Sequence, residues 1–434
     1  MLESPTGGDR GLLVHVDLKN LQFKADTHEF CDLALAAGVQ VIIQIKSTRK
    51  APSAKYLIGS GKVLEIQKII SEAAITVVLF NYELTPGQQR NLERTLQCRV
   101  LDRTTLILDI FAQRARTFEG KLQVELAQLQ YLASRLVRGW THLERQKGGI
   151  GLRGPGETQL EVDKRLIRHR IRYISQRLEK VRSQRQISRR ARDRASIPTV
   201  AIVGYTNAGK STLFNALTGA ETFAANQLFA TLDPTLRAIT LPEIGKVVLS
   251  DTVGFIKDLP HNLIEAFKAT LEEASEANLV LHVIDRSNPD WRDQRIQVEA
   301  VLEQIGALDI PRIEVFNKAD LVSEYVDLQD AYTENNDAKC FWVSAKNNSG
   351  LTTLLSAIKR QLTHMQVVLQ IKLPPSEGAL RAKLFATGAL VQETIDEQGY
   401  WALDISMPQV KWLQLQHHEK RIVDYLRPKL LDSE

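Results

Sequence analysis

The chain has 434 residues, of which 44% are hydrophobic and 25% are charged, a composition typical of a soluble globular protein and not of a disordered one. At about 150 residues per domain, this length suggests roughly three domains. No apolar run approaches the 18 or so residues that a membrane span requires. Three cysteines (Cys31, Cys98 and Cys340) are too few and too widely spaced for a disulfide scaffold or a CxxC metal pair. We therefore expect a protein of the reducing cytoplasm.

The first region, residues 1–115, alternates apolar strands with helical segments. Strands are expected over 12–16, 41–45 and 75–80, and helices over 27–37 and 63–70. Thr85 and Pro86 begin a further helix, because a threonine side chain can cap free amide groups and proline suits the first turn. The alternation predicts a small α/β domain.

The second region, residues 116–194, has heptad spacing. The two apolar stripes are Leu122, Leu126, Leu129, Ala133, Leu136, Trp140 and Leu143, and then Leu160, Ile167, Ile171, Ile174, Leu178 and Val181. Such stripes predict a two-helix antiparallel coiled coil with arms of about 40 Å each. Residues 148–156 hold five glycines and one proline, which predicts an extended loop at the tip whose backbone can approach another surface closely.

Positive charge is concentrated in the second arm. Residues 164–194 contain 13 Lys or Arg and only two acidic residues, a net charge of +11 that leaves −6 for the rest of the chain. A basic segment on an otherwise acidic protein indicates a polyanionic partner, and nucleic acid fits best. The residues expected to bind RNA are Gly149 and Arg153 in the loop and Arg168, Arg172 and Arg182 on the helix.

The third region, residues 195–365, carries the chemistry. An expected strand over 199–203 runs into GxxxxGK[ST] and then into a helix over 212–217, which is the setting of a phosphate-binding loop. Its backbone amides would wrap the phosphates, Lys210 would reach the β and γ phosphates, and Ser211 would ligate Mg²⁺. The predicted phosphate-binding residues are Gly204, Tyr205, Thr206, Asn207, Ala208, Gly209, Lys210, Ser211 and Thr212.

A second motif follows the strand expected over residues 246–250, and consists of Asp251, Thr252, Val253 and Gly254. The acid can hold Mg²⁺ through water, and the Gly254 amide can meet the γ-phosphate. Residues 228–235 lie between the two motifs, where a mobile threonine must complete the magnesium shell. By chemistry alone Thr222, Thr231 and Thr235 all qualify.

Two later strand ends predict the base. The first carries Asn317, Lys318, Ala319 and Asp320, and the second carries Ser344, Ala345 and Lys346. The Asp320 carboxylate can accept both the N1 and the 2-amino hydrogens of guanine, which adenine does not offer. Lys318 can cover the base plane and the Ala345 amide can meet the guanine carbonyl oxygen. We therefore predict GTP as the nucleotide.

The last region, residues 366–434, predicts a helix over 376–385 and strands over 389–395 and 400–405, and so a small α+β domain without a catalytic constellation. The predicted fold class is α/β: a P-loop GTPase domain preceded by a small α/β domain and a helical hairpin, and followed by this α+β domain.

These motifs together resemble the HflX family of GTPases. The resemblance rests on GGIGLRGPGETQLE at 148–161, FATLDPT at 229–235, DTVGFI at 251–256, the NKAD and SAK pair, and residues 56–63, and it covers about 11–365. It implies a cytoplasmic GTPase that binds the large ribosomal subunit and is linked in bacteria to splitting stalled or stress-damaged ribosomes. From the motifs we expect Mg²⁺ as the cofactor and ribosomal RNA as a partner, and we expect a monomer. The resemblance also selects Thr231 as the magnesium threonine, with Phe229, Ala230, Leu232 and Asp233 beside it in the GTP site.

The position after DTVG, where many small GTPases have a water-orienting glutamine, is Phe255. An apolar ring cannot orient water, and HflX-like proteins share this replacement, so we expect slow intrinsic hydrolysis that depends on Lys210, Thr231 and Gly254. Two alternatives remain: a GTPase of ribosomal RNA or tRNA maturation or of ribosome assembly, and a non-enzymatic scaffold. Cys340 inside an expected core strand, and a tail without cysteine, disfavour an RNA-modifying enzyme.

Overall fold

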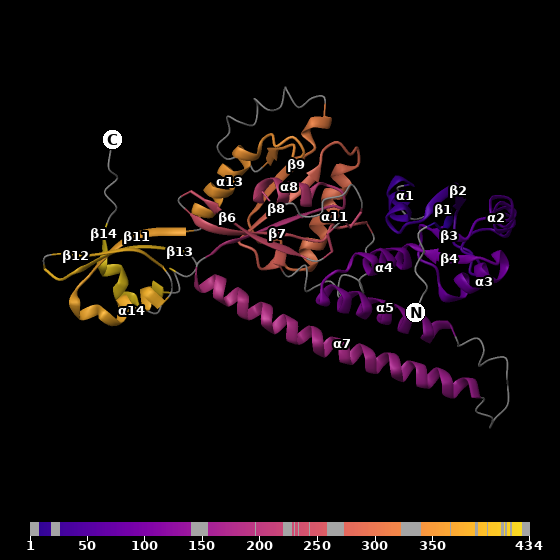
Figure 1. Cartoon of the computed structure of the whole chain (residues 1–434), viewed down its shortest axis with the longest axis horizontal. Helices are drawn as coiled ribbons and strands as arrows, with labels where there is room; N and C mark the ends of the chain where they lie inside the picture. The colour runs from indigo at the N-terminus through magenta and orange to yellow at the C-terminus, as the bar shows by residue number, and fades with distance from the viewer. Residues whose placement is uncertain are drawn as a thin grey trace. The chain divides into compact units, whose positions relative to one another are not determined.

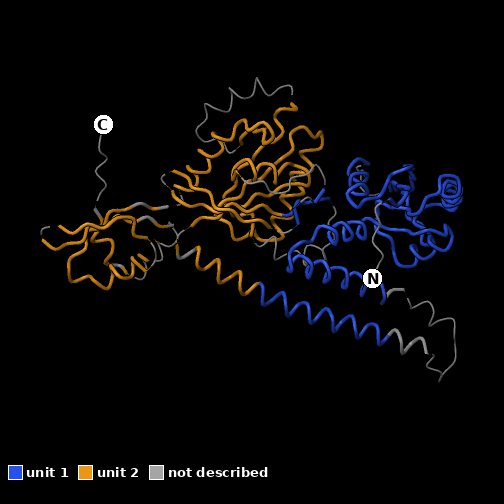
Figure 2. Tube along the Cα trace, in the orientation of Figure 1, with its two compact units in different colours: residues 1–181, 223–233, 253–270 blue, residues 182–222, 234–252, 271–434 orange. Residues whose placement is uncertain are grey.

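The protein is described from a computed structural model that falls into two compact units (Figure 2). Unit 1 comprises residues 1–181, 223–233 and 253–270, and unit 2 comprises residues 182–222, 234–252 and 271–434. The structure describes residues 8–18, 27–139, 155–195, 197–219, 228–229, 231–232, 234–242, 244–257, 273–322, 340–364, 366–386, 389–396, 398–408, 412, 415–416 and 419–427.

Unit 1 begins with a parallel sheet of order β2-β1-β3-β4 (Figure 1). Its strands are β1 (Arg10–Leu18), β2 (Gln40–Arg49), β3 (Val77–Phe80) and β4 (Arg99–Asp102), and the helices between them are α1 (Thr27–Ala36), α2 (Ser60–Ala73) and α3 (Pro86–Leu96). Apolar side chains of the strands and of α2 and α3 form one core. Thr85 caps α3 as expected, because its side chain accepts from the Gln88 amide and the Gln88 side chain accepts from the Thr85 amide.

Helix α4 (Arg103–Arg114) was not predicted from the sequence. Its first nine residues are all buried, so the helix has no polar face to give a helical period. It packs against α1, α5 and β4. Asp102 caps it, with one carboxylate oxygen accepting from the amide and the hydroxyl of Thr105 at 2.9 and 2.6 Å.

The predicted helical hairpin consists of α5 (Phe118–Gly139) and α7 (Pro155–Arg194). Their seam contains Leu122, Leu126, Leu129, Ile171, Ile174 and Leu178, all from the two predicted stripes. Arg170 pairs with Glu125 at 2.7 Å, and Arg177 lies over the Phe118 ring at 4.7 Å. Residue numbers therefore rise along one helix as they fall along the other, which confirms the antiparallel arrangement.

Helix α7 is longer than the predicted arm of about 40 Å. At 1.5 Å per residue its 40 residues span about 60 Å, and α5 is described as far as Gly139. Helix α5 also contacts α3 and α4, so it is part of the first domain's packing as well as of the hairpin. Helix α7 begins at Pro155, inside the predicted loop 148–156, because proline suits the first helical position. The loop residues 148–154 lie outside the described residues.

Unit 2 contains a six-stranded sheet of order β10-β9-β8-β5-β7-β6, in which only β6 is antiparallel to its neighbour. The strands are β5 (Thr199–Gly204), β6 (Thr235–Leu241), β7 (Gly245–Asp251), β8 (Leu279–Asp285), β9 (Arg312–Asn317) and β10 (Cys340–Trp342). Helices α8 (Lys210–Thr218), α11 (Trp291–Gln304) and α13 (Leu351–His364) complete this region. The central strands are buried along nearly their whole length, as is typical of parallel sheets covered by helices on both faces.

The end of the chain forms an antiparallel sheet of order β12-β13-β11-β14. Its elements are β11 (Gln366–Leu373), the 3₁₀ helix η2 (Pro375–Glu377), α14 (Gly378–Ala386), β12 (Leu390–Ile395), β13 (Trp401–Pro408), the 3₁₀ helix η3 (Lys420–Tyr425) and β14 (Leu426–Arg427). The predicted α/β fold class, with its α+β C-terminal region, is confirmed. Across the described residues, none of the helices combines the length and apolarity needed to cross a membrane.

The hairpin seam gives a first prediction. Ile174 is fully buried, so Ile174→Ala should weaken the α5–α7 pairing by about 2–4 kcal/mol. Leu166 on the same helix is 60% exposed, and Leu166→Ala should cost less than about 0.5 kcal/mol. Amide hydrogen exchange of α5 and α7 in the full chain measures the free energy of local opening. Equal protection of the amides from exchange in the two variants would show that Ile174 does not stabilise the pairing of α5 with α7.

Candidate functional site: a guanine nucleotide site

The candidate site lies at the carboxyl ends of the parallel strands of unit 2. The first strand, β5, is central, and β7 and β8 pair with its two edges. In open α/β sheets a ligand binds at this edge, where connections leave a central strand in opposite directions. The loops after β5, β9 and β10, and the last residue of β7, carry the predicted motifs.

The phosphate loop between β5 and α8 depends on its glycines. Gly209 has φ = 89°, a conformation that residues with side chains rarely adopt, and it precedes the first turn of α8. A Cβ atom at Gly209 would collide with the Asn317 side-chain amide, and one at Gly204 would collide with the Val283 carbonyl oxygen. The loop therefore packs directly on the neighbouring strands. Loop amides that lead into the start of a helix are an arrangement that favours anions.

Lys210 is buried at the start of α8, and its Nζ donates to the Tyr205 carbonyl oxygen at 2.8 Å. Burial lowers the pKa of Lys210 to about 8, while the nearby Asp251 carboxylate acts in the opposite direction. The side chain is thus held across the loop by a backbone acceptor.

Ser211 and Asp251, the two residues of unit 2 that are predicted to hold Mg²⁺ directly or through water, are in contact. The Ser211 hydroxyl donates to Asp251 Oδ2 at 2.7 Å, which joins the start of α8 to the end of β7. Thr252, the next residue, is fully buried and donates to the Ile202 carbonyl oxygen at 2.7 Å, which fixes the chain just after Asp251. Hydroxyl and carboxylate oxygens are the donors that Mg²⁺ prefers.

Asn317 connects the phosphate loop to the base-recognition loops. Its Nδ2 donates to the Ala208 carbonyl oxygen at 2.9 Å, and its Oδ1 accepts from the Ala345 amide at 3.1 Å. Asn317 is 2% exposed, so both hydrogen bonds are shielded from water. The Ala345 amide, expected to meet the guanine carbonyl oxygen, is therefore engaged with Asn317 in this structure.

The other base-recognition residues also pair across strands. Asp320 is exposed at the surface and accepts from the Ser344 hydroxyl at 2.6 Å, so two of the predicted motifs meet. Lys318 pairs with Asp285 at 2.7 Å, at the end of β8. Sequence analysis missed Asp285, although an acidic residue closing a buried strand is the same signal that identified Asp251.

Most of the other predicted residues belong to unit 1 or lie outside the described residues, and Thr235 belongs to unit 2. Thr231 is partly exposed, whereas Phe229, Leu232, Val253 and Gly254 are buried. Ala230, Asp233 and the alternative magnesium residue Thr222 lie outside the described residues, as do the loop residues Gly149 and Arg153. Thr235 is the first residue of β6 and is paired with Asp251 in the β6–β7 ladder.

Cys340 differs from expectation, since β10 is an edge strand and the residue is only partly buried. Burial and the neighbouring Glu314 carboxylate nevertheless raise the pKa of the thiol, which makes Cys340 a poor nucleophile. Within the part of the chain that the structure describes, no cluster of three or more His, Cys, Asp or Glu residues could hold a metal.

A phosphate loop on a central parallel strand, an acid on the next strand and an asparagine-centred base-recognition region define a P-loop GTPase. Three sequence families match the chain: "GTP-binding GTPase N-terminal" over residues 24–112, "GTP-binding GTPase Middle Region" over 114–192 and "50S ribosome-binding GTPase" over 199–318. The chain is 50% identical over 426 residues to the GTPase HflX of Escherichia coli, covering 98% of this chain and all of the relative. The chain belongs to the HflX family of GTPases.

Other comparisons add detail. The GTPase HflX of Magnetococcus marinus is 46% identical over 402 residues, covering 90% of this chain and 91% of the relative. Among solved structures, "SsGBP and GDP complex" is similar with a TM-score of 0.47 and 26% identity, and the match covers 82% of this chain and 99% of that one. Membership of the family and the intact phosphate loop make this protein an enzyme that hydrolyses GTP to GDP and phosphate.

Base selection can be tested at Asp320. Asp320→Asn replaces a double acceptor by a side chain that offers one acceptor and one donor, so the variant should prefer the xanthine nucleotide, whose 2-carbonyl accepts a hydrogen bond. GTP affinity should fall by roughly 100-fold or more, since an unpaired polar group in such a site can cost up to about 10⁴-fold. Asp309→Asn, at an exposed acid of the same unit, is the control and should change neither the affinity for GTP nor that for the xanthine nucleotide. A variant that still prefers GTP would show that Asp320 does not recognise the base.

His282, in the middle of β8, predicts an acid sensitivity of the GTPase region. Burial lowers the pKa of His282 to about 3, and Arg312, Arg295 and Lys210 contribute in the same direction. In the unfolded chain the imidazole takes up its proton near pH 6.5, so between about pH 6.5 and 3 the unfolded state binds more protons and stability falls as pH falls.

Within that window, we expect His282 to lower the free energy of unfolding by up to about 1.4 kcal/mol for each unit by which the pH falls. His282→Gln should flatten the dependence of the unfolding free energy on pH between 6.5 and 5, measured by denaturant titration. His169→Gln, at an exposed histidine of α7, serves as the control and should leave the dependence unchanged. If the unfolding free energy depends on pH in the same way in the unmodified protein and in both variants, His282 is not the source of the acid sensitivity.

Proposed function

We propose that this protein is a Mg²⁺-dependent GTPase that associates with the large ribosomal subunit and its ribosomal RNA, and that dissociates stalled or stress-damaged ribosomes. It would act in the cytoplasm as a monomer. The bound nucleotide would determine whether the basic helix α7 engages RNA.

The observation that carries this proposal is the division of α7 into two faces. Ile171, Ile174 and Leu178 face the seam with α5, whereas Arg168 and Arg172 are exposed. Within the described residues, neither of these two arginines has an ion-pair partner. They form a cationic surface on a long helix, suited to phosphate contacts.

Not every basic residue of α7 is available for this role. Arg170 is paired with Glu125, and Arg189 and Arg192 both approach the buried carboxylate of Glu273, at 3.1 and 3.6 Å. Arg182 is partly buried and interacts within the protein. Arg168 and Arg172 are therefore stronger candidates for RNA contacts than Arg182.

The similarity to a family described as "50S ribosome-binding GTPase" over residues 199–318 supports the choice of partner. The predicted RNA-binding loop precedes α7 directly, so the loop and the cationic surface would belong to one RNA-binding element. A polyanion of fixed shape, such as folded ribosomal RNA, suits a rigid helix better than a flexible partner does.

The nucleotide site fits Mg²⁺. Ser211 would hold the ion directly, Asp251 would hold it through water, and Thr231 would complete the shell when a γ-phosphate is present. When bound, the ion would neutralise charge on the β and γ phosphates. Lys210 would add a second positive charge, and the Gly254 amide would donate to the γ-phosphate, so that hydrolysis releases both Thr231 and Gly254.

Hydrolysis would be slow without a partner. Phe255 is buried and its ring offers no donor or acceptor, so it cannot orient the attacking water. A backbone group or the ribosome would have to supply this step, which links the rate of turnover to docking.

The test of this function is GTP turnover with and without purified large ribosomal subunits. We expect the subunits to raise kcat at least tenfold, because docking would supply the missing orientation of water, and we expect GTP to favour cosedimentation over GDP. A Lys210→Ala variant controls for contaminating GTPases. If the large subunits leave the GTP turnover rate unchanged, and the protein binds free tRNA, the RNA-maturation alternative is favoured.

The cationic surface gives a separate prediction. Arg168→Gln combined with Arg172→Gln should weaken ribosome binding and reduce the slope of log affinity against log salt by about 1 for each phosphate that the variant no longer neutralises. Lys121→Gln combined with Lys246→Gln removes the same charge from exposed positions elsewhere and should leave the slope unchanged. An unaltered slope in the arginine variant would place the RNA-binding residues on another surface.

A further inference from the structure

Helix α4 contacts both chain segments that carry the predicted γ-phosphate residues. Near its end, the Phe111 ring packs edge-to-face against Phe229, with centroids 4.6 Å apart. At its start, Arg103 Nη2 donates to the Lys257 carbonyl oxygen at 3.0 Å. Phe229 lies two residues before Thr231, and Lys257 lies three residues after Gly254. Both segments belong with α4 to unit 1, as the common colour in Figure 2 shows.

Both contacts are shielded from water. Phe111 and Phe229 are 1% and 2% exposed. The Arg103 guanidinium is buried and forms an ion pair with Glu29 of α1, so its charge is compensated and one of its donors remains for the Lys257 carbonyl. A hydrogen bond from a charged group inside a protein is stronger than one at the surface.

Phe229 has φ = 56°, a conformation that a bulky residue adopts only where its surroundings enforce it. Its neighbours in both segments, Leu228, Leu232, Phe255 and Ile256, are also buried. The backbone at Phe229 and Leu232, and after Gly254, thus lies among buried side chains.

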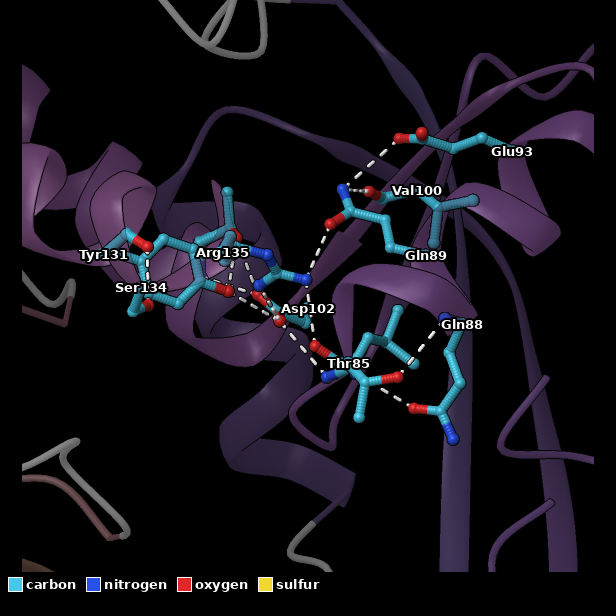
Figure 3. A network of polar contacts seen from close by, with 11 residues as sticks. Thr85, Gln88, Gln89, Glu93, Val100, Asp102, Tyr131, Ser134 and Arg135 are labelled. Atoms are coloured by element: carbon cyan, nitrogen blue, oxygen red, sulfur yellow. Dashed lines mark hydrogen bonds and ion pairs between the residues drawn. The ribbon is translucent and has the colours of Figure 1, made fainter. Parts of the chain in front are cut away.

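Helix α4 is itself fixed by α5, as Figure 3 shows. The other carboxylate oxygen of Asp102, the residue that caps α4, accepts from the Tyr131 hydroxyl at 2.8 Å and pairs with Arg135 at 3.0 Å. Arg135 also donates to the Leu84 carbonyl oxygen and the Gln89 side chain, at 2.9 and 2.8 Å. A satisfied buried network of this kind leaves the start of α4 little freedom.

We propose that Arg103 and Phe111 are positioning residues for GTP hydrolysis. Through Lys257 and Phe229, helix α4 holds the segments of Gly254 and Thr231 in the arrangement that the reaction needs. Backbone placement matters more here than in GTPases with a water-orienting glutamine, because Phe255 supplies no polar group. The proposal rests on the proposed roles of Thr231 and Gly254 in binding the γ-phosphate.

The test uses the full chain and three variants, Arg103→Gln, Phe111→Leu and Phe229→Leu, with single-turnover GTP hydrolysis and GDP affinity as the two measurements. We expect the hydrolysis rate to fall at least fivefold in each. GDP affinity should stay within twofold, because the phosphate loop and residues 317–320 belong to unit 2. Arg103→Lys keeps a charge for Glu29 and a donor for the carbonyl, and should restore the rate to within twofold.

Ile110→Val is the matched control, since Ile110 is fully buried on the same helix but makes neither contact. Its hydrolysis rate should be unchanged even where denaturant titration shows a loss of stability. If Phe111→Leu does not fold, Phe229→Leu decides the question, because Phe229 lies outside α4 and outside the N-terminal sheet. Unchanged rates in the folded variants, or GDP affinity falling together with the rate, would overturn the proposal.

The variant Thr231→Ala distinguishes the proposed role of Thr231 from the proposed role of α4. If it leaves hydrolysis unchanged, the proposed role of Thr231 is wrong. If it abolishes hydrolysis while Phe229→Leu and Arg103→Gln do not alter the rate, the role of Thr231 stands and the role of α4 is wrong.

Discussion

The two hydrogen bonds of Asn317 are the interaction on which the nucleotide site depends. They join the Ala208 carbonyl of the phosphate loop to the Ala345 amide of the last recognition loop, across strands that are far apart in the sequence. Because the side chain is buried, neither bond can be exchanged for water without cost. The predicted phosphate-binding and base-recognition loops are therefore joined through one buried side chain.

A second constraint governs unit 1. Helix α4 has no solvent-facing side over its first nine residues, so its position is set entirely by what packs around it. Its neighbours include the first arm of the hairpin through Asp102 and Arg135, and the segments that contain Thr231 and Gly254 through Phe229 and Lys257. One buried helix of unit 1 thus contacts both the hairpin arm and these two segments.

Much of this structure could be predicted from local sequence signals. The strands of β-branched residues, the cap at Thr85 and the heptad stripes of the hairpin depend on neighbours along the chain, and each was found in the structure. The GTPase motifs were located for the same reason, since each follows a recognisable strand. The assignment of individual side chains to GTP, magnesium and RNA stays a prediction.

What the sequence did not predict depends on contacts between distant segments. Helix α4 has no solvent-exposed face over its first nine residues, so its sequence shows no helical alternation of apolar and polar residues. The extra length of α7 was missed because the apolar stripe ends at Val181, whereas the helix continues through the basic residues as far as Arg194. The pairing of Lys318 with Asp285, and the edge position of Cys340, follow from the order of strands in the sheet, which spacing along the chain does not encode.

The close approach of Gly209 to Asn317 has a practical consequence for genetics. Any side chain introduced at Gly209 would push against the amide that supports the guanine-binding loop. An allele at this position would therefore combine two defects, and its phenotype could not be ascribed to impaired phosphate binding alone. If the predicted roles hold, an allele at Lys210 would affect phosphate binding alone and an allele at Asp320 would affect base recognition alone.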